Sequence, residues 1–89
     1  MRETTIKDSK MNKFDYKDYV ANPRKYELFK TATVRDTIVN EIGEVRAGTI
    51  VSLEYLGARR NHLYRRDEPI YRLNTGDLCY ANNLTDFCL

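Results

Sequence analysis

The sequence predicts a small, mostly β domain that begins with a short helical segment. Two stretches rich in β-branched and apolar residues, 31–39 and 45–57, alternate in the manner of half-buried strands. Further along, Asn74–Asp77 (NTGD) is a strong hairpin signal, because glycine can adopt the positive φ angle that a tight turn needs. Short strands separated by closely spaced turns are typical of a small barrel or sandwich.

The composition limits the class of protein. At 89 residues the chain is one domain, and a domain of this size buries only ~60–65% of the surface that its unfolded form exposes. The formal charge of +2 implies no partner by itself. No run of ~18 apolar residues is present and the polar N-terminus has no apolar core, so neither a membrane span nor a secretory signal is expected. Cys79 and Cys88 are expected to be free thiols of a cytoplasmic protein, with a bridge between them as the open alternative.

The first 28 residues predict a tail followed by a helical extension. Residues 1–13 are polar, mixed in charge and without periodicity, which predicts disorder. Residues 14–28 predict helix: Asp15 is a good N-cap, and Phe14 and Tyr19 are spaced to form a hydrophobic staple around it.

A second helical start follows at Asn22-Pro23, where proline can occupy the first helical position. In the first helix Tyr16, Tyr19 and Val20 fall on one face, which we expect to pack on the β domain because two helical turns are not stable alone in water. The tyrosines of this extension, Tyr26 included, could instead form an aromatic docking surface, but core packing is the favoured interpretation.

The β pattern begins after Phe29. Ala32, Val34 and Ile38 share one parity, and in the central run Val51, Leu53 and Tyr55 share one face. Ile50 and Leu56 are expected to be buried as well, since a strongly bent strand can bury both faces. The expected order is strand 30–36, loop 37–48, strand 49–56, loop 57–69, strand 70–73, turn 74–77, strand 78–81, a 3₁₀ turn at 82–84 and a last strand at 86–89.

Two segments in this order of elements are similar to segments of a known family. AGTIV at 47–51 is similar to the glycine-led entry into the second strand of SH3-like barrels, and YANNL at 80–84 is similar to their step from the fourth strand to a 3₁₀ turn. The sequence thus resembles a bacterial type of SH3-like barrel. The resemblance implies that residues 29–89 form a five-stranded barrel in which 37–48 is the long first loop and 74–77 the distal turn.

The sequence differs from the peptide-binding members of that family at the residues that those domains use for binding. Peptide-binding SH3 domains carry an aromatic motif on the first strand and loop, a tryptophan at the start of the third strand and a tyrosine in the 3₁₀ turn. This chain has DTIVNEIGE in the loop at 36–44, no tryptophan, and Leu84 in place of the tyrosine. Polyproline recognition needs an aromatic-lined groove, so it is not expected here.

The basic segment 58–66 (ARRNHLYRR) is the sharpest functional signal, with four arginines and no acid. Arginine and tyrosine often anchor protein interfaces, so the leading hypothesis is a non-catalytic module that binds a protein partner through loop 57–68. The same arginines could neutralise phosphates while tyrosines stack on unpaired bases, which leaves RNA or single-stranded DNA as the alternative. The candidate binding residues are Arg59, Arg60, His62, Tyr64, Arg65, Arg66 and Tyr71.

Two further interpretations stay open. The segment could be a solvated loop whose arginines pair with Glu54, Asp67 and Glu68. The chain could also be a structural subunit of a larger assembly, with the tyrosine-rich helix as its docking element.

Catalysis is not expected. His62 is the single histidine, without cysteine or carboxylate at ligand spacing, so neither a metal site nor a cofactor is predicted. The acidic residues are scattered, and Cys79 has no neighbour in sequence that would lower its pKa.

Overall fold

The computed structural model describes residues 14–89, so the predicted tail at 1–13 lies outside the described residues. The fold is mostly β with a helical beginning, as predicted. The helical elements are α2 (Tyr16–Ala21), α3 (Pro23–Leu28) and the 3₁₀ helix η1 (Ala81–Asn83), and the strands are β1 (Thr31–Val34), β2 (Ile38–Val39), β3 (Glu44–Val45), β4 (Ile50–Asn61), β5 (Arg66–Leu73), β6 (Leu78–Tyr80) and β7 (Leu84–Cys88).

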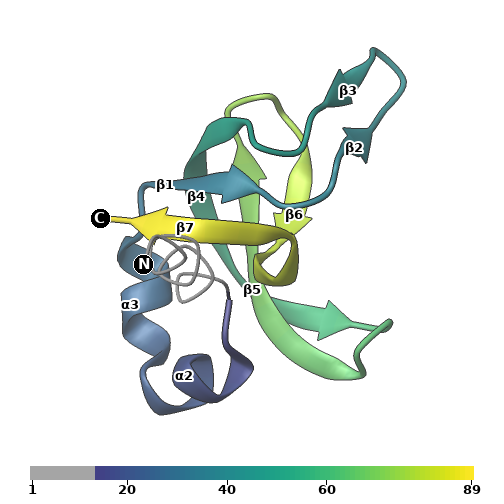
Figure 1. The fold of residues 1–89 in the computed structure, drawn as a ribbon. Coiled ribbons are helices and arrows are strands. Elements are labelled where there is room, and N and C mark those ends of the chain that lie inside the picture. Colours follow the sequence, from purple (N-terminus) through teal and green to yellow (C-terminus); the bar gives the residue numbers. More distant parts are fainter. Residues whose placement is uncertain (1–13) are drawn as a thin grey trace, which may run out of the picture.

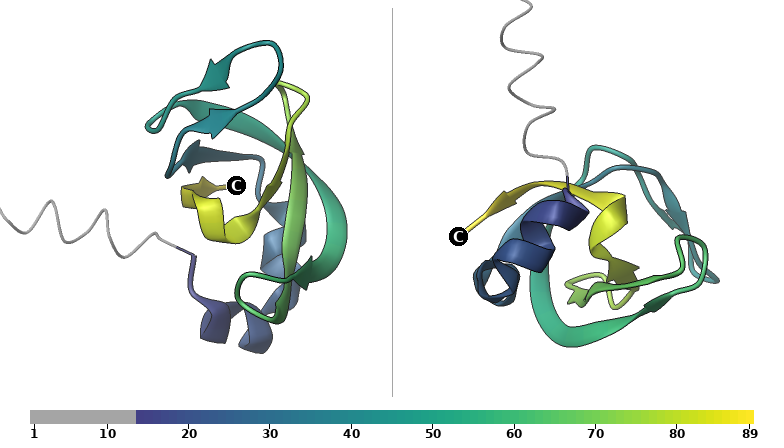
Figure 2. Two further views of the ribbon diagram at one scale, coloured as in Figure 1. Left: turned by 90° about the vertical axis from the view of Figure 1, so that its right-hand side faces the viewer. Right: turned by 90° about the horizontal axis from the view of Figure 1, so that it is seen from below.

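Five of the strands form one antiparallel sheet in the order β6-β5-β4-β1-β7, while β2 and β3 form a separate two-stranded arm. The arm and the helices lie at opposite ends of the sheet (Figures 1 and 2). The pairings among residues 14–89 leave β6 and β7 as edges that are not paired with each other, so the closure into a five-stranded barrel is not confirmed.

Strand β4 is longer than the sequence indicated. At Gly57 the backbone takes a φ of 114°, and the pairing with β5 shifts register between Tyr55 and Gly57. Such a bulge bends the strand without ending it, and glycine permits the positive φ. The strand therefore continues to Asn61, and β5 begins at Arg66. The expectation of a loop over 57–69 is wrong, because this stretch forms the paired ends of β4 and β5 and the turn between them.

The side chains of β4 alternate only partly as expected. Val51 is buried and Leu53 and Tyr55 are half-buried, which confirms their common face. The expected burial of Ile50 and Leu56 is wrong, because these side chains are 72% and 38% exposed. The bend lies at the bulge, where Leu56 still faces solvent, and no element of the described chain, 14–89, covers the side chain of Ile50.

The helical extension packs as predicted on the sheet. Asp15 caps α2 by accepting a hydrogen bond from the Lys17 amide, and the rings of Phe14 and Tyr19 lie 6.2 Å apart as a hydrophobic staple. Proline occupies the start of α3, as expected. Val20 is an exception to the predicted apolar face, since it is 60% exposed.

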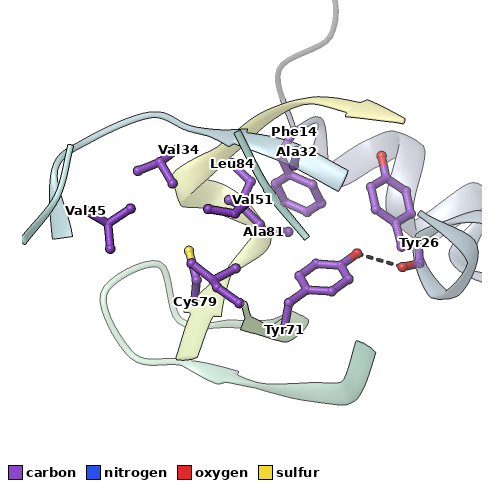
Figure 3. Packing of buried hydrophobic residues seen from close by; sticks show 11 residues of the cluster. Phe14, Tyr26, Ala32, Val34, Val45, Val51, Tyr71, Cys79, Ala81 and Leu84 are labelled. Carbon is purple, nitrogen blue, oxygen red and sulfur yellow. Dashed lines mark hydrogen bonds between the residues drawn. The ribbon is translucent and has the colours of Figure 1, made fainter. Parts of the chain in front are cut away.

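Tyr26 of α3 joins the extension to the sheet. Its ring is 4% exposed and meets the rings of Phe29 and Phe87 at 5.3 and 5.8 Å. Its backbone oxygen accepts a 2.7 Å hydrogen bond from the Tyr71 hydroxyl (Figure 3). Its own hydroxyl donates to Asp18, whose pKa is held below the usual value mainly by Lys25 and then by this tyrosine. The helices are thus part of the same core as the strands.

The remaining strands match the predicted order with shifted ends. The Asn74–Asp77 hairpin is confirmed, with Gly76 at a φ of 95°. The 3₁₀ turn covers Ala81–Asn83, one residue earlier than expected, and the last strand begins at Leu84 and not at 86. Leu84 is fully buried, so the strand starts where its first side chain can enter the core.

Candidate binding surface

The candidate segment folds as the far end of the β4–β5 hairpin. Arg59, Arg60 and Asn61 of β4 are paired with Glu68, Asp67 and Arg66 of β5 in that order. Asn61 shapes the turn between the strands: its side-chain oxygen accepts from the Leu63 amide at 3.1 Å and its backbone oxygen from the Tyr64 amide at 3.2 Å. The turn residues are therefore held in place by the paired strands β4 and β5 that lead into and out of the turn.

Arg66 is part of the protein's interior contacts. Its Nε lies 2.6 Å from Oε2 of Glu68, a carboxylate that is fully buried and also accepts from Asn61 Nδ2 at 3.3 Å. Its guanidinium lies 4.4 Å from the ring centre of Tyr16 and 5.1 Å from that of Tyr64. This side chain thus neutralises Glu68 and joins the hairpin to α2, and the predicted role of Arg66 in binding stays a prediction.

Tyr71 is likewise unavailable. Its side chain is fully buried, its hydroxyl is bonded to the Tyr26 backbone oxygen, and its ring lies 5.9 Å from that of Tyr55. Burial raises the pKa of this hydroxyl far above its ordinary value. The expectation that Tyr71 adjoins the binding face is wrong, because strand β5 turns its side chain into the core between the sheet and the helices.

The other predicted residues stay exposed on the hairpin: Arg59, Arg60, His62, Tyr64 and Arg65. Among residues 14–89 no carboxylate lies within 4.0 Å of the guanidinium of Arg59, Arg60 or Arg65, whereas Arg66 pairs with Glu68 and Arg72 with Glu54. The interpretation of a loop neutralised by its own acids therefore applies to Arg66 alone. Tyr64 in the turn is 45% exposed, and the guanidinium of Arg66 lies over its ring.

An open groove of about 350 Å³ lies beside this hairpin. It runs from the turn across β6 to the base of the β2–β3 arm and the 3₁₀ helix. Its walls include Leu63 and Tyr64 of the turn, Leu78 and Tyr80 of β6, Ile38 and Asp36 at the base of the arm, and Asn82 and Asn83 of η1. Leu63 and Leu78 are 80% and 53% exposed, so the groove offers apolar surface to solvent.

Hydrogen bonds fix the walls of the groove. The Tyr80 hydroxyl donates to the Arg60 backbone oxygen at 2.6 Å and so ties β6 to the hairpin. The Asn83 side chain accepts from the Asp36 amide at 3.0 Å and donates to the Asp36 backbone oxygen at 3.1 Å, which ties η1 to the base of the arm. A groove with fixed walls loses less entropy when a ligand binds.

The sequence did not indicate this groove. The sequence predicts Leu63 in a loop and Leu78 and Tyr80 in a strand, and no local pattern relates positions so far apart. Leu63 alone carried a signal, as an apolar residue within a basic stretch.

The described residues were also compared with the requirements of a metal site and of a membrane-spanning helix. In the part of the chain from 14 to 89, no group of three or more histidine, cysteine or acidic side chains could hold a metal ion. No helix within this range has the length and apolar character needed to cross a membrane. Every buried side-chain nitrogen or oxygen atom of these residues has a hydrogen-bond partner, so the core holds no unexplained polar group.

The two cysteines, both free, are expected to differ strongly in reactivity. Cys79 is buried, and burial raises its pKa to about 11, whereas Cys88 is exposed. Only the thiolate attacks disulfide reagents, so at pH 8 Cys79 should react roughly 100-fold more slowly than Cys88 with Ellman's reagent. A Cys88→Ser variant should lose the fast phase and keep the slow one, and its remaining thiol should react fast only in denaturant. Two equally fast thiols in the native protein would contradict this placement of Cys79.

Comparison of the chain with protein-family models, with curated proteins and with solved structures found no match.

Proposed function

We propose that this protein is a non-catalytic binding module that holds an extended segment of a protein partner in the groove beside the β4–β5 hairpin. The observation that supports it most is the juxtaposition in one place of exposed apolar side chains and arginines that have no carboxylate within 4.0 Å among residues 14–89. Leu63, Tyr64 and Leu78 line the groove, and the hairpin that carries two of them also carries Arg59, Arg60 and Arg65.

The chemistry of the ligand follows from this arrangement. Apolar side chains favour an apolar anchor in the groove, because its burial removes apolar surface from water at ~25 cal/mol per Å². The arginines favour carboxylates beside that anchor, and charge-assisted hydrogen bonds to carboxylate suit the planar guanidinium. Among residues 14–89, Asp36 is the one acidic group of the groove wall, so the acidic flank of the ligand should lie toward the hairpin and away from the arm.

Nucleic-acid binding is the less favoured function. Arg66 is occupied by Glu68 and Tyr71 is buried, which removes one phosphate contact and one stacking ring from the set. Tyr64 remains as the single exposed aromatic side chain in the turn, and one ring supports little base stacking.

The proposal extends to the fold family and the compartment. The arm between β1 and β4, the β4–β5 hairpin and the 3₁₀ helix before the last strand follow the element order of SH3-like barrels, which supports membership of that group. Cys79 and Cys88 are both free, which fits a reducing compartment such as the cytoplasm.

The proposal can be tested by selecting binders from a displayed library of random peptides. We expect enrichment of sequences that combine a large apolar residue with adjacent Asp or Glu. The variants Leu63→Ser and Leu78→Ser should each lower affinity for a selected peptide by ~5- to 30-fold, because each removes about 1–2 kcal/mol of apolar contact. Val20→Ser, an exposed apolar position on α2, is the matched control and should bind normally.

Two results would count against this function. The proposal of a protein segment as ligand would be wrong if the selected peptides shared no pattern of apolar and acidic residues. It would also be wrong if Leu63→Ser and Leu78→Ser both bound the selected peptides as tightly as wild type. Binding of single-stranded oligonucleotides that weakens with salt at a log–log slope near −0.7 per phosphate contact, and that is lost in Arg59→Ala/Arg65→Ala, would favour the nucleic-acid alternative.

A further inference from the structure

The β2–β3 arm presents an isoleucine that is almost entirely in water. Ile42 at its tip is 97% exposed and Val39 is 77% exposed. One exposed apolar side chain on a surface is ordinary, so its surroundings decide whether it has a role.

The tip is held in a fixed conformation. The side-chain oxygen of Asn40 accepts hydrogen bonds from the amides of Ile42 and Gly43 at 2.9 and 2.8 Å. The side-chain nitrogen of Asn40 donates to Asp77 at 2.9 Å, which ties the arm to the β5–β6 turn. Ile42 is therefore presented on a rigid support, and a contact made through it loses little conformational entropy.

The tip also carries acidic charge. Glu41 and Glu44 flank Ile42 in the sequence and are both exposed. Glu44 pairs with Arg46 at 3.0 Å, while Glu41 has no cation within 4.0 Å among residues 14–89. An apolar side chain beside a free carboxylate is the ligand chemistry that we derived for the groove, so the inference rests on the proposed function.

The β2–β3 arm and the far end of the β4–β5 hairpin lie at opposite ends of the molecule (Figures 1 and 2). The hydrogen bond between the side chains of Asn40 and Asp77 holds the arm at its end of the molecule. The tip therefore cannot fold back onto the hairpin of its own chain, and a groove that receives it has to belong to another copy.

We propose that the β2–β3 arm of one copy of this protein docks in the groove of a second copy. Ile42 contacts Leu63 and Leu78 there, and Glu41 faces the arginines of the hairpin. The two surfaces in such a contact are different, so each docked copy still offers a free groove and a free arm, and chains of copies can form. The contact is small, so association is weak and is expected at concentrations of roughly 0.1–1 mM.

Sedimentation velocity across this concentration range tests the proposal with the full chain. The weight-average mass of the wild-type protein should rise with concentration. It should stay at the monomer value for Ile42→Ser, which lacks the apolar tip, and for Leu63→Ser, which lacks a wall of the groove. Both side chains are exposed, so circular dichroism and thermal unfolding should match wild type in each variant.

A mixture of the two variants identifies the pairing. Ile42→Ser keeps an intact groove and Leu63→Ser keeps an intact tip, so the mixture should form a 1:1 dimer and stop there. A wild-type protein that stays monomeric, self-association that either variant leaves unchanged, or a mixture without dimer would overturn the second copy as occupant. If wild type stays monomeric while selected peptides still bind in the groove, this inference fails alone and the proposed function stands.

Discussion

Replacing Tyr26 by alanine is expected to destabilise the protein by about 4 kcal/mol, because the variant deletes the ring that joins the helices to the sheet. The ring is 4% exposed and has edge contacts with Phe14, Tyr19, Phe29 and Phe87 at 5.3–5.8 Å. Such a cavity would cost much of the total stability of a domain this small, which is of the order of 5–15 kcal/mol. Urea unfolding followed by circular dichroism measures the change.

Two variants separate the contribution of the ring from other effects of the substitution. Tyr26→Phe keeps the ring and loses the hydrogen bond to Asp18, so about 1 kcal/mol is expected. Tyr64→Ala removes a tyrosine that is 45% exposed, and should cost about 1 kcal/mol or less. If Tyr26→Ala were as stable as Tyr64→Ala, the helical extension would not share the core of the sheet.

Replacing Arg66 by alanine is expected to cost about 3 kcal/mol, although the residue belongs to a basic stretch of the surface. Glu68 is fully buried, and its oxygens accept from Arg66 at 2.6 Å and from Asn61 at 3.3 Å. Without the guanidinium a carboxylate remains buried with one neutral hydrogen bond, and an uncompensated buried charge is strongly destabilising. The loss should be visible as a lower midpoint of urea unfolding at pH 7.

Arg65→Ala is the matched control, since the neighbouring arginine has no carboxylate within 4.0 Å among residues 14–89; its expected effect on stability is under ~0.5 kcal/mol. Removing both charges in Arg66→Met/Glu68→Leu should restore most of the stability, because no buried charge is then left without a partner. A single Arg66→Ala variant with wild-type stability would show that the pair is not a structural element.

Local chemistry made several elements predictable. Asp15 as a cap, Pro23 at the start of a helix and Gly76 in a hairpin turn each act within a few residues of themselves. The alternation of Val51, Leu53 and Tyr55 fixed one face of the central strand, because side chains in a strand point to opposite sides in turn. The mostly β class followed from these signals.

The extent of β4 was not predictable in the same way. Gly57 reads locally as the end of a strand, since glycine commonly stops or turns the chain. In the structure it is the bulge of a strand that continues to Asn61, because the partner strand β5 supplies hydrogen bonds beyond it. A choice between a turn and a bulge depends on a partner strand, which the residues around Gly57 do not specify.

The sequence by itself determined the positions of the caps and turns, the parity of the central strand and the presence of a basic segment. The tertiary structure decided which members of that segment are available. In the folded protein Tyr71 is buried against Tyr26, and Arg66 forms an ion pair with Glu68. Leu63 and Leu78 lie together as walls of one groove. The physical reason is that propensity and capping act over a few residues, whereas burial and charge pairing arise between elements that meet only when the sheet folds.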